Sequence, residues 1–377
     1  MKHIITKLTC AFLSGLLITI AAGCSGQPQQ SQDTQATQAT QATHPTQSES
    51  EAVSADVKEK LDKTLSDEQY SGIVRISKGG EVIYEYVNGK DDNGKPLTMD
   101  ASMPIGSVSK QFCAACILFL CEQKVLSVDD TLDKFYPNDK INKNLTVKHL
   151  LNMSSGFRNY LDFVDQSMVG ENEWDNVNTI TREIFKQDPG FEPGEDYEYS
   201  NSNYFLLANI VEKASGIAYH KFLREQFLEP LKMTHTGFVE EISGAPAWAS
   251  ALAAGELKEN YFYFPGMTKG AGDIVTNAED MDKWMRGLSE GKVLSTEGFR
   301  QMTESINPNS VEEYGYGLWH MPYGGVGHVG QIPPSFGAVD YINTERDVNL
   351  FAASNSGRGM SYVQEIPQEL LSVLFEE

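Results

Sequence analysis

The sequence predicts an α+β domain whose antiparallel sheet is completed by strands from both ends of the globular region. Near its start, residues 71–90 contain two runs rich in β-branched residues around Gly79 and Gly80, which predicts a hairpin. Near its end, four strand-like runs follow one another over residues 314–355, and residues 361–377 predict a closing helix. Strands at both ends with mostly helical segments between them favour a sheet flanked by helices and a mainly helical subdomain.

Helices are predicted where apolar residues recur at every third or fourth position. This pattern covers residues 53–65 before the hairpin and residues 203–216 in the middle of the chain. It returns over residues 277–291, where Asn277 is a residue type favoured at the N-cap of a helix. The composition remains typical of a globular protein to the end, so we expect one domain over residues 53–377.

The first residues have the layout of a secretory signal, with Lys2 and Lys7 flanking the start of an apolar run and small residues ending at Cys24. Residues 21–24, AAGC, are similar to a bacterial lipoprotein cleavage box, in which the cysteine is lipidated and becomes the new N-terminus. Alanine at the first position is a weaker match than leucine, which leaves plain secretory cleavage nearby as the alternative. We favour a lipoprotein signal peptide over residues 1–23 and a lipid anchor on Cys24.

Residues 24–52 are rich in Gln, Thr and Ser and contain three QAT repeats. Such a segment has no apolar face to bury, which predicts a disordered tether. A lipid anchor followed by a tether indicates an exported protein on the extracytoplasmic face of the cell membrane.

The chain is acidic, with 30 Lys and Arg residues against 52 Asp and Glu residues and a formal net charge of −22. This charge argues against nucleic acid as a partner and against electrostatic docking on anionic lipid. Membrane attachment is therefore expected through the lipid on Cys24.

The five cysteines do not form the pattern of a disulfide framework. Cys10 lies in the predicted signal and Cys24 is the predicted anchor, whereas Cys113, Cys116 and Cys121 lie in one apolar run. Cys113 and Cys116 are spaced as C-x-x-C, but no second such pair or His pair follows at zinc spacing. We expect buried thiols in a core helix, and neither a metal nor an organic cofactor.

The heptapeptide GSVSKQF, residues 106–112, places Ser107 and Lys110 three residues apart, immediately before the apolar run. On a helix these positions share a face, so the amine would lie beside the hydroxyl. Amides at a helix N-terminus also favour developing negative charge. An N-cap serine is the alternative interpretation of Ser107, and the same S-x-x-K spacing recurs at Ser289 and Lys292, where a helix is predicted to end.

Two further motifs follow in the chain, YSN at residues 199–201 and HVG at residues 328–330. With residues 107–110 they resemble the three motif blocks of the serine β-lactamase and penicillin-binding protein superfamily, in the family's order. The resemblance is to the class C β-lactamase and D-alanyl-D-alanine carboxypeptidase branch. It runs from about residue 54 to the C-terminus and includes the segments LTVKHLLNMSSGF and FEPGEDYEYSNSNYFLLANIVEKASG.

The resemblance implies roles for the residues of the first two motifs. Ser107 would be the nucleophile, and Lys110 would keep its hydroxyl deprotonable. Tyr199 would share the general-base role and pass the proton to the leaving group, and a cation such as Lys110 would favour its phenolate. Asn201 would hydrogen-bond the substrate amide.

For the third motif, the resemblance implies that His328 and Gly330 line the cleft and that the backbone N–H groups of Ser107 and Gln331 form an oxyanion hole. Many β-lactamases of this family have lysine in place of His328. A histidine is neutral for much of the time near pH 7 and offers only a switchable charge for a substrate carboxylate. His328 therefore shifts the expected activity away from efficient β-lactam hydrolysis. The QIPP sequence after the motif also departs from the glycine-rich continuation common in relatives.

Taken together, the resemblance implies a serine hydrolase that forms an acyl-enzyme on Ser107. We expect a D-amino-acid peptidase or carboxypeptidase acting on peptidoglycan-type peptides, ahead of an esterase or amidase on small acyl substrates and of a class C-like β-lactamase. A penicillin-binding sensor without turnover is the alternative from another class. A binding protein, however, has no need of the intact set of Ser107, Lys110, Tyr199 and Asn201.

Other prominent residues receive structural interpretations. His149 and His320 have no carboxylate or second histidine at metal spacing, which favours structural or surface positions. Trp284 and Trp319 are expected in the core. The aromatic run at residues 261–264 either lines the cleft or packs in the core.

Overall fold

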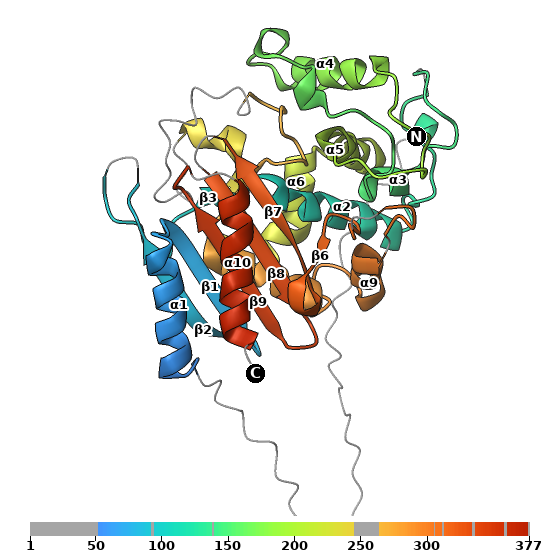
Figure 1. Ribbon diagram of the computed structural model, residues 1–377. Helices are drawn as coiled ribbons and strands as arrows, with labels where there is room; N and C mark the ends of the chain where they lie inside the picture. The colour runs from blue at the N-terminus through green and yellow to red at the C-terminus, as the bar shows by residue number, and fades with distance from the viewer. Residues whose placement is uncertain are drawn as a thin grey trace, which may run out of the picture. The chain divides into compact units, whose positions relative to one another are not determined.

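Six strands form one antiparallel sheet in the order β2-β1-β9-β8-β7-β6 (Figure 1). β1 pairs with β9 along its whole length, from Gly72 opposite Ser354 to Lys78 opposite Val348. The N-terminal hairpin is thereby joined to the C-terminal strands, which confirms the predicted α+β architecture. The strands are β1 (Gly72–Lys78), β2 (Glu81–Asn88), β6 (Trp319–Met321), β7 (Gly325–Ile332), β8 (Phe336–Asn343) and β9 (Val348–Ser354).

The computed structural model describes residues 52–91, 94–137, 139–244, 264–304, 306–310, 313–333, 336–357 and 360–375. The predicted signal, Cys24 and all of the predicted tether except Ala52 lie outside these residues. Three residues of the aromatic run, Tyr261 to Tyr263, also lie outside them, whereas Phe264 packs against the core.

Helices cover both faces of the sheet. α1 (Ala55–Asp67) and α10 (Met360–Phe375) lie against one face, in front of the strands in Figure 1, and α8 (Ala278–Ser289) packs on β1 and β9. Successive strand side chains point to opposite faces. Val74 of β1 therefore packs with α1 and α10, whereas its neighbour Ile73 packs in the core that contains α8.

The remaining helices form a mainly helical part beside the sheet. α2 (Lys110–Glu122) is buried along nearly its whole length and contacts α5 (Asn201–Ser215), α6 (Tyr219–Leu223) and α9 (Thr296–Glu304). α3 (Val147–Leu151) also packs on α5. The other elements used below are α4 (Glu173–Lys186) and a small sheet in the order β3 (Met103–Pro104), β5 (Ile274–Thr276) and β4 (Gly237–Phe238).

Most of the elements predicted from periodicity are present. Helices occur as α1, α5 and α8, and Asn277 caps α8 because its Oδ1 atom accepts the N–H of Asp280 at 2.9 Å. Cys113 and Cys116 are free and buried in α2, as predicted. Their burial raises the pKa of both thiols, which favours the inert protonated form.

Two details of the prediction are wrong. The first C-terminal strand was predicted to begin at Tyr314, but β6 begins at Trp319, because residues 314–319 turn back on themselves around Gly317 with φ of +79°. The helix predicted from Ser107 begins instead as a 3₁₀ turn, η2 (Gly106–Ser109), and becomes α-helical only at Lys110.

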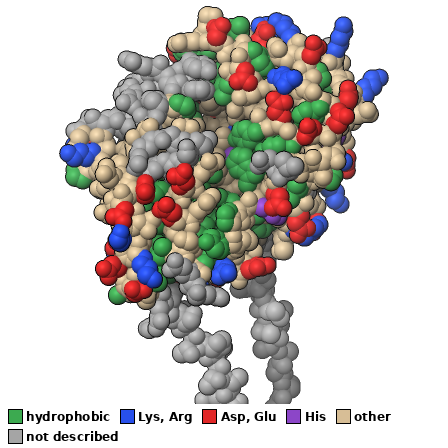
Figure 2. Space-filling view, viewed as in Figure 1, with side chains coloured by type: hydrophobic (Ala, Val, Ile, Leu, Met, Phe, Trp, Pro, Cys, Tyr) green, Lys and Arg blue, Asp and Glu red, His purple; other side chains and the backbone are tan. Residues whose placement is uncertain are grey.

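The surface of the described residues mixes charges and apolar groups. On the face shown in Figure 2, acidic and basic side chains are interspersed between patches of hydrophobic ones. None of the helices within the described ranges is long and apolar enough to cross a membrane.

Candidate active site

Ser107 and Lys110 lie where η2 passes into α2. Ser107 is partly exposed, whereas Lys110 is completely buried. The Lys110 Nζ atom is 2.9 Å from Ser107 Oγ. The hydroxyl and the amine are therefore in hydrogen-bond contact, which is the first geometric requirement for an activated serine.

The Lys110 amine has two further partners. It donates to Asn201 Oδ1 at 2.7 Å and to the Ala271 carbonyl oxygen at 2.7 Å. Both of these oxygens only accept hydrogen bonds, whereas the Ser107 hydroxyl both donates and accepts. Both protonation states of the amine satisfy all three contacts. A protonated amine donates three N–H groups, and a neutral amine donates two and accepts the Ser107 O–H with its lone pair.

The surroundings of Lys110 favour this neutral form. Burial lowers the pKa of Lys110 to about 7, although Cys113 and Asp273 act in the opposite direction. Near neutral pH, a substantial share of the amine is unprotonated and able to take a proton from Ser107.

Tyr199 lies just before α5 and faces the same amine. Its ring centroid is 5.0 Å from Lys110 Nζ, and the ring stacks on Trp319 with centroids 5.4 Å apart. Burial raises the pKa of Tyr199, and a hydrogen bond with Ser107 opposes this effect only in part. The predicted phenolate is therefore wrong. The site favours a neutral phenol beside an amine that is partly unprotonated near neutral pH, because burial penalises both charges.

Asn201 is the first residue of α5, and its amide is held by a residue that the sequence did not single out. The Oδ1 atom of Asn159 accepts both the backbone N–H and the Nδ2–H of Asn201, each at 3.2 Å. These bonds orient the amide so that its oxygen faces Lys110. Asn159 belongs to none of the three motifs, and no spacing connects it with them.

His328 lies on β7 and is completely buried. Its Nδ1–H donates to the Val329 carbonyl oxygen at 2.7 Å, so the neutral ring accepts the Tyr314 hydroxyl at Nε2, at 3.3 Å. Burial lowers the pKa of His328 well below its ordinary value, and the charge of Lys110 acts in the same direction. The predicted switchable charge is therefore wrong, because this ring stays neutral.

Gly330 and Gln331 on β7 lie directly against η2. A Cβ atom on Gly330 would be 1.9 Å from the Ile105 carbonyl oxygen, and one on Gly106 would be 2.7 Å from the Gln331 nitrogen. Gly106 also has φ of +51°, a region that favours glycine. These glycines let the two backbones touch and bring the peptide groups of Ser107 and Gln331 together.

A buried polar network lies behind His328. Asp340 on β8 accepts the His328 N–H at 3.0 Å and Gln111 Nε2–H at 2.9 Å, and Gln111 in turn accepts Trp284 Nε1–H at 2.9 Å. Burial raises the pKa of Asp340 to about 7, although the hydrogen bonds to its carboxyl group oppose the shift. This network joins α2, α8 and the central sheet at the site, and the sequence analysis did not identify it.

His220 on α6 fixes the segment that carries the Ala271 carbonyl. Its ring lies between two carboxylates, with Nδ1 2.8 Å from Glu240 Oε1 and Nε2 2.7 Å from Asp273 Oδ2. Burial alone would lower the pKa of His220, but the bonds to Asp273 and Glu240 outweigh it and raise the pKa to about 10. The protonated His220 thus forms an ion pair with Asp273. The one sequence signal was Asp273 itself, an acid within the otherwise apolar run GAGDIVT.

The histidines and tryptophans expected to have structural roles are mostly found in such positions. His149 accepts a backbone N–H at the start of α3, and His320 contacts a backbone carbonyl oxygen, which supports their structural interpretation. Trp284 is buried, as predicted. Trp319 is only partly buried and stacks on Tyr199, so it belongs to the site as well as to the core. Across the described part of the chain, no three His, Cys, Asp or Glu side chains are grouped as metal ligands.

Known proteins resemble this chain over most of its length. The family model described as Beta-lactamase matches residues 56–375. The chain belongs to this family. It is a serine hydrolase of the β-lactamase and penicillin-binding protein superfamily, as its motifs predicted. A putative penicillin-binding protein, PbpX of Bacillus subtilis, is 27% identical over 315 residues, which cover 82% of this chain and 76% of the relative.

Solved structures share the fold of this family member. A D-amino acid amidase from Ochrobactrum anthropi superposes with a TM-score of 0.73 at 24% identity, over 85% of this chain and 99% of that one. An octameric penicillin-binding protein homologue from Pyrococcus abyssi gives a TM-score of 0.69 at 26% identity, over 85% of this chain and 77% of that one.

The pKa of Lys110 gives a prediction for the rate of acylation. If the neutral amine takes the Ser107 proton, the acylation rate should rise about tenfold per pH unit below pH 7 and level off above it. Lys110→Arg should remove this profile and most of the rate, because a guanidinium stays protonated. The measurement is the rate of labelling by a penicillin or a chromogenic ester between pH 5 and 9. A rate in the wild type that does not change over this range would contradict the assignment.

The pKa of His220 gives a prediction for stability. Because its folded-state pKa is raised, its contribution should be complete below about pH 6.5, decline above that pH and be lost near pH 10. His220→Gln should therefore lower the free energy of unfolding by on the order of 3–5 kcal/mol at pH 6 and by much less at pH 10. Urea denaturation at both pH values measures the difference, with the exposed His320→Gln as control. An effect of equal size at both pH values would refute the ion-pair role.

Proposed function

We propose that this protein is an exported serine hydrolase that works through an acyl-enzyme on Ser107 and acts as a D-amino-acid peptidase or carboxypeptidase on peptidoglycan-type peptides. The observation that carries the catalytic part is the contact between Ser107 Oγ and the buried Lys110 amine. The substrate class is supported by the names of its relatives, a putative penicillin-binding protein and, by fold, a D-amino acid amidase.

In acylation, Ser107 Oγ attacks the substrate carbonyl carbon while its proton passes to the neutral Lys110 amine. The backbone N–H groups of Ser107 and Gln331 stabilise the developing oxyanion, and Asn201 holds the substrate amide. Tyr199 then donates its phenolic proton to the leaving group, and Lys110 returns a proton to Tyr199. In deacylation, water gives a proton to Lys110 and attacks the acyl carbon, and Ser107 leaves with a proton restored.

The neutral His328 bears on the choice of substrate. A substrate with a free carboxylate gains from a cation at the third motif, and this position holds a buried neutral ring instead. This observation favours, as a second candidate, hydrolysis of small amides or esters that carry no carboxylate. It also makes β-lactam hydrolysis the least favoured of the catalytic alternatives.

The location and anchoring of the protein form a separate part of the proposal. The apolar run after Lys2 and Lys7 and the box at residues 21–24 support export and lipidation of Cys24. A tether of about thirty residues would then let the catalytic domain move above the membrane surface.

Replacing the nucleophile tests the catalytic part. Ser107→Ala should lower turnover of D-alanine amide and of peptides ending in D-alanyl-D-alanine by at least about 10⁴-fold. The melting temperature should hardly change, because the side chain is partly exposed. Ser289→Ala, in the second S-x-x-K sequence, is the matched control and should leave turnover intact. Unchanged turnover in Ser107→Ala would exclude the proposed mechanism.

Intact mass after incubation with a penicillin separates the remaining alternatives. A persistent adduct that requires Ser107 would indicate a penicillin-binding peptidase or sensor, and turnover of D-amino-acid substrates distinguishes these two. An unmodified protein with intact penicillin would favour the amidase or esterase, and hydrolysed penicillin would favour the β-lactamase.

Replacing the proposed anchor tests the location. Cys24→Ser in the full chain, expressed in a bacterium with a lipoprotein pathway, should abolish incorporation of labelled fatty acid and release the protein from the membrane fraction. Cys121→Ser serves as the control and should remain in the membrane fraction. Equal labelling of both variants would refute lipidation at Cys24.

A further inference from the structure

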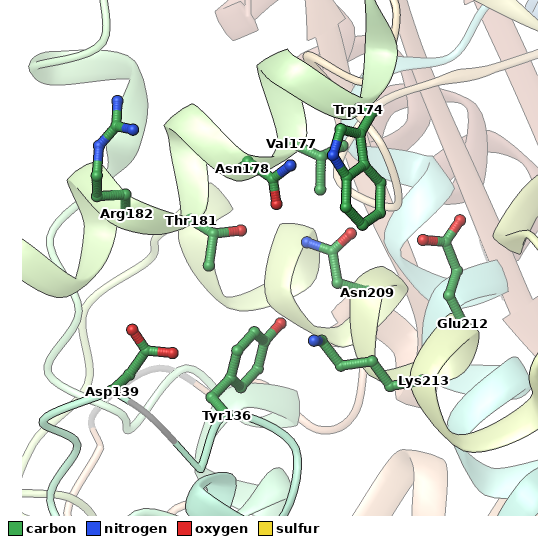
Figure 3. A pocket seen from close by; sticks show the side chains of 10 residues that line it. All are labelled: Tyr136, Asp139, Trp174, Val177, Asn178, Thr181, Arg182, Asn209, Glu212 and Lys213. Carbon is green, nitrogen blue, oxygen red and sulfur yellow. The ribbon is translucent and has the colours of Figure 1, made fainter.

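A pocket of about 420 Å³ lies between α4 and α5 and is closed by the segment that carries Tyr136 (Figure 3). None of the residues that line it belongs to the Ser107 site. Its volume is in the usual range for a small-molecule site. The helical part of the fold therefore contains a cavity that the proposed chemistry does not use.

Polar atoms in this pocket lack partners within the described structure. Asn209 is 3% exposed, and neither its amide nitrogen nor its amide oxygen has a hydrogen-bond partner among the described residues. The Tyr136 hydroxyl is also buried and lacks a partner there. Burial raises the pKa of the Tyr136 hydroxyl, and the nearby Asn209 amide lowers it by a smaller amount. The two groups nevertheless do not reach hydrogen-bond geometry. Both side chains point into the pocket in Figure 3.

Unpaired buried polar atoms are costly. The Asn209 Nδ2–H groups donate, its Oδ1 atom accepts, and the Tyr136 hydroxyl can do both, so the site is suited to a ligand that pairs them. The Tyr136 ring is held in place by the Lys213 amine, 4.5 Å from its centroid, and by an edge contact with Phe185 at 5.1 Å. The polar groups are thus fixed before a ligand arrives, which limits the entropy that binding costs.

The rim of the pocket offers an aromatic platform. The Trp174 side chain on α4 is 73% exposed and lines the pocket together with Asn178 and Asn209 (Figure 3). An exposed tryptophan on a polar pocket is an apolar surface suited to the C–H face of a ring ligand.

The charges of the pocket balance. Two cations, Arg182 and Lys213, line it together with two anions, Asp139 and Glu212. Glu212 also pairs with the buried Lys269 amine at 2.9 Å, and the charge of that amine is balanced in turn by Glu173. A ligand of strong charge therefore gains little here, and a neutral ligand that carries both donors and acceptors fits best.

We propose that this pocket binds a neutral saccharide, with one pyranose ring stacked on Trp174 and its hydroxyl or acetamido groups paired with Asn209 and Tyr136. Free sugar and a unit of a longer glycan share this chemistry. Asn209 lies eight residues after Asn201 on α5, about 12 Å further along the helix, so a long glycan bound here would lie near the Ser107 site. The inference goes beyond the proposed function and does not depend on hydrolysis by Ser107.

Calorimetric titration of the full chain with N-acetylglucosamine and with its β-1,4-linked tetramer tests the proposal. Both should bind, and much tighter binding of the tetramer would identify a glycan as the ligand, whereas equal affinity would identify the free sugar. Asn209→Leu and Trp174→Ala should each weaken binding at least roughly tenfold. Lys186→Ala on the outer surface of α4 is the matched control and should bind as the wild type.

Two further measurements keep the test decisive. Asn209→Leu should leave the melting temperature unchanged or raised, because it removes unpaired polar atoms at similar volume, so lost binding cannot then be ascribed to unfolding. The Ser107→Ala variant should still bind the sugars, which separates this site from the proposed catalysis. Absence of binding at millimolar sugar, binding that survives both pocket substitutions, or binding of an N-acetyl-dipeptide amide in place of the sugars would overturn the proposal.

Discussion

The buried amine of Lys110 is the contact on which the rest of the site depends. Its three oxygen partners come from η2, from the start of α5 and from the segment before β5, so one atom fixes three distant parts of the chain. Burial in the helical core makes a cation costly there and brings the pKa to about 7. The packing of α2 is thus a chemical requirement as well as a source of stability, because an exposed lysine would be protonated near neutral pH and unable to accept the Ser107 proton.

The charges around this amine are arranged so that its pKa stays low. Asp273 tends to raise the pKa of Lys110, and an unpaired carboxylate there would favour a protonated amine. His220 lies against Asp273 and carries the compensating positive charge, which Glu240 also stabilises. The same ion pairs hold the segment that carries the Ala271 carbonyl. A single buried histidine therefore both positions a hydrogen-bond acceptor and screens an anion, although it touches neither Ser107 nor Lys110 through any described hydrogen bond.

The sequence predicted the residues whose spacing is local and missed those that meet only through tertiary packing. Ser107 and Lys110 share one turn, and the hairpin and most helices follow from short periodic patterns. These features could therefore be predicted from the sequence. Asn159 and His220 reach the site across long stretches of chain and belong to no motif. The predictions of the ionisation states of Tyr199 and His328 were wrong for the same reason. The motifs identified both residues in the sequence, but the pKa of each side chain depends on its burial, which only the folded core determines.

The neutrality of His328 is coupled to the state of Lys110. The two groups share a buried region, and the charge of Lys110 helps to lower the pKa of His328. The repulsion is mutual, so a permanent cation at position 328 would lower the pKa of Lys110 further. Here the Val329 carbonyl and the Tyr314 hydroxyl together fix one neutral tautomer of the imidazole. The pKa of Lys110 is therefore brought near 7 without a second cation beside it, and position 328 offers no charge for the recognition of a substrate.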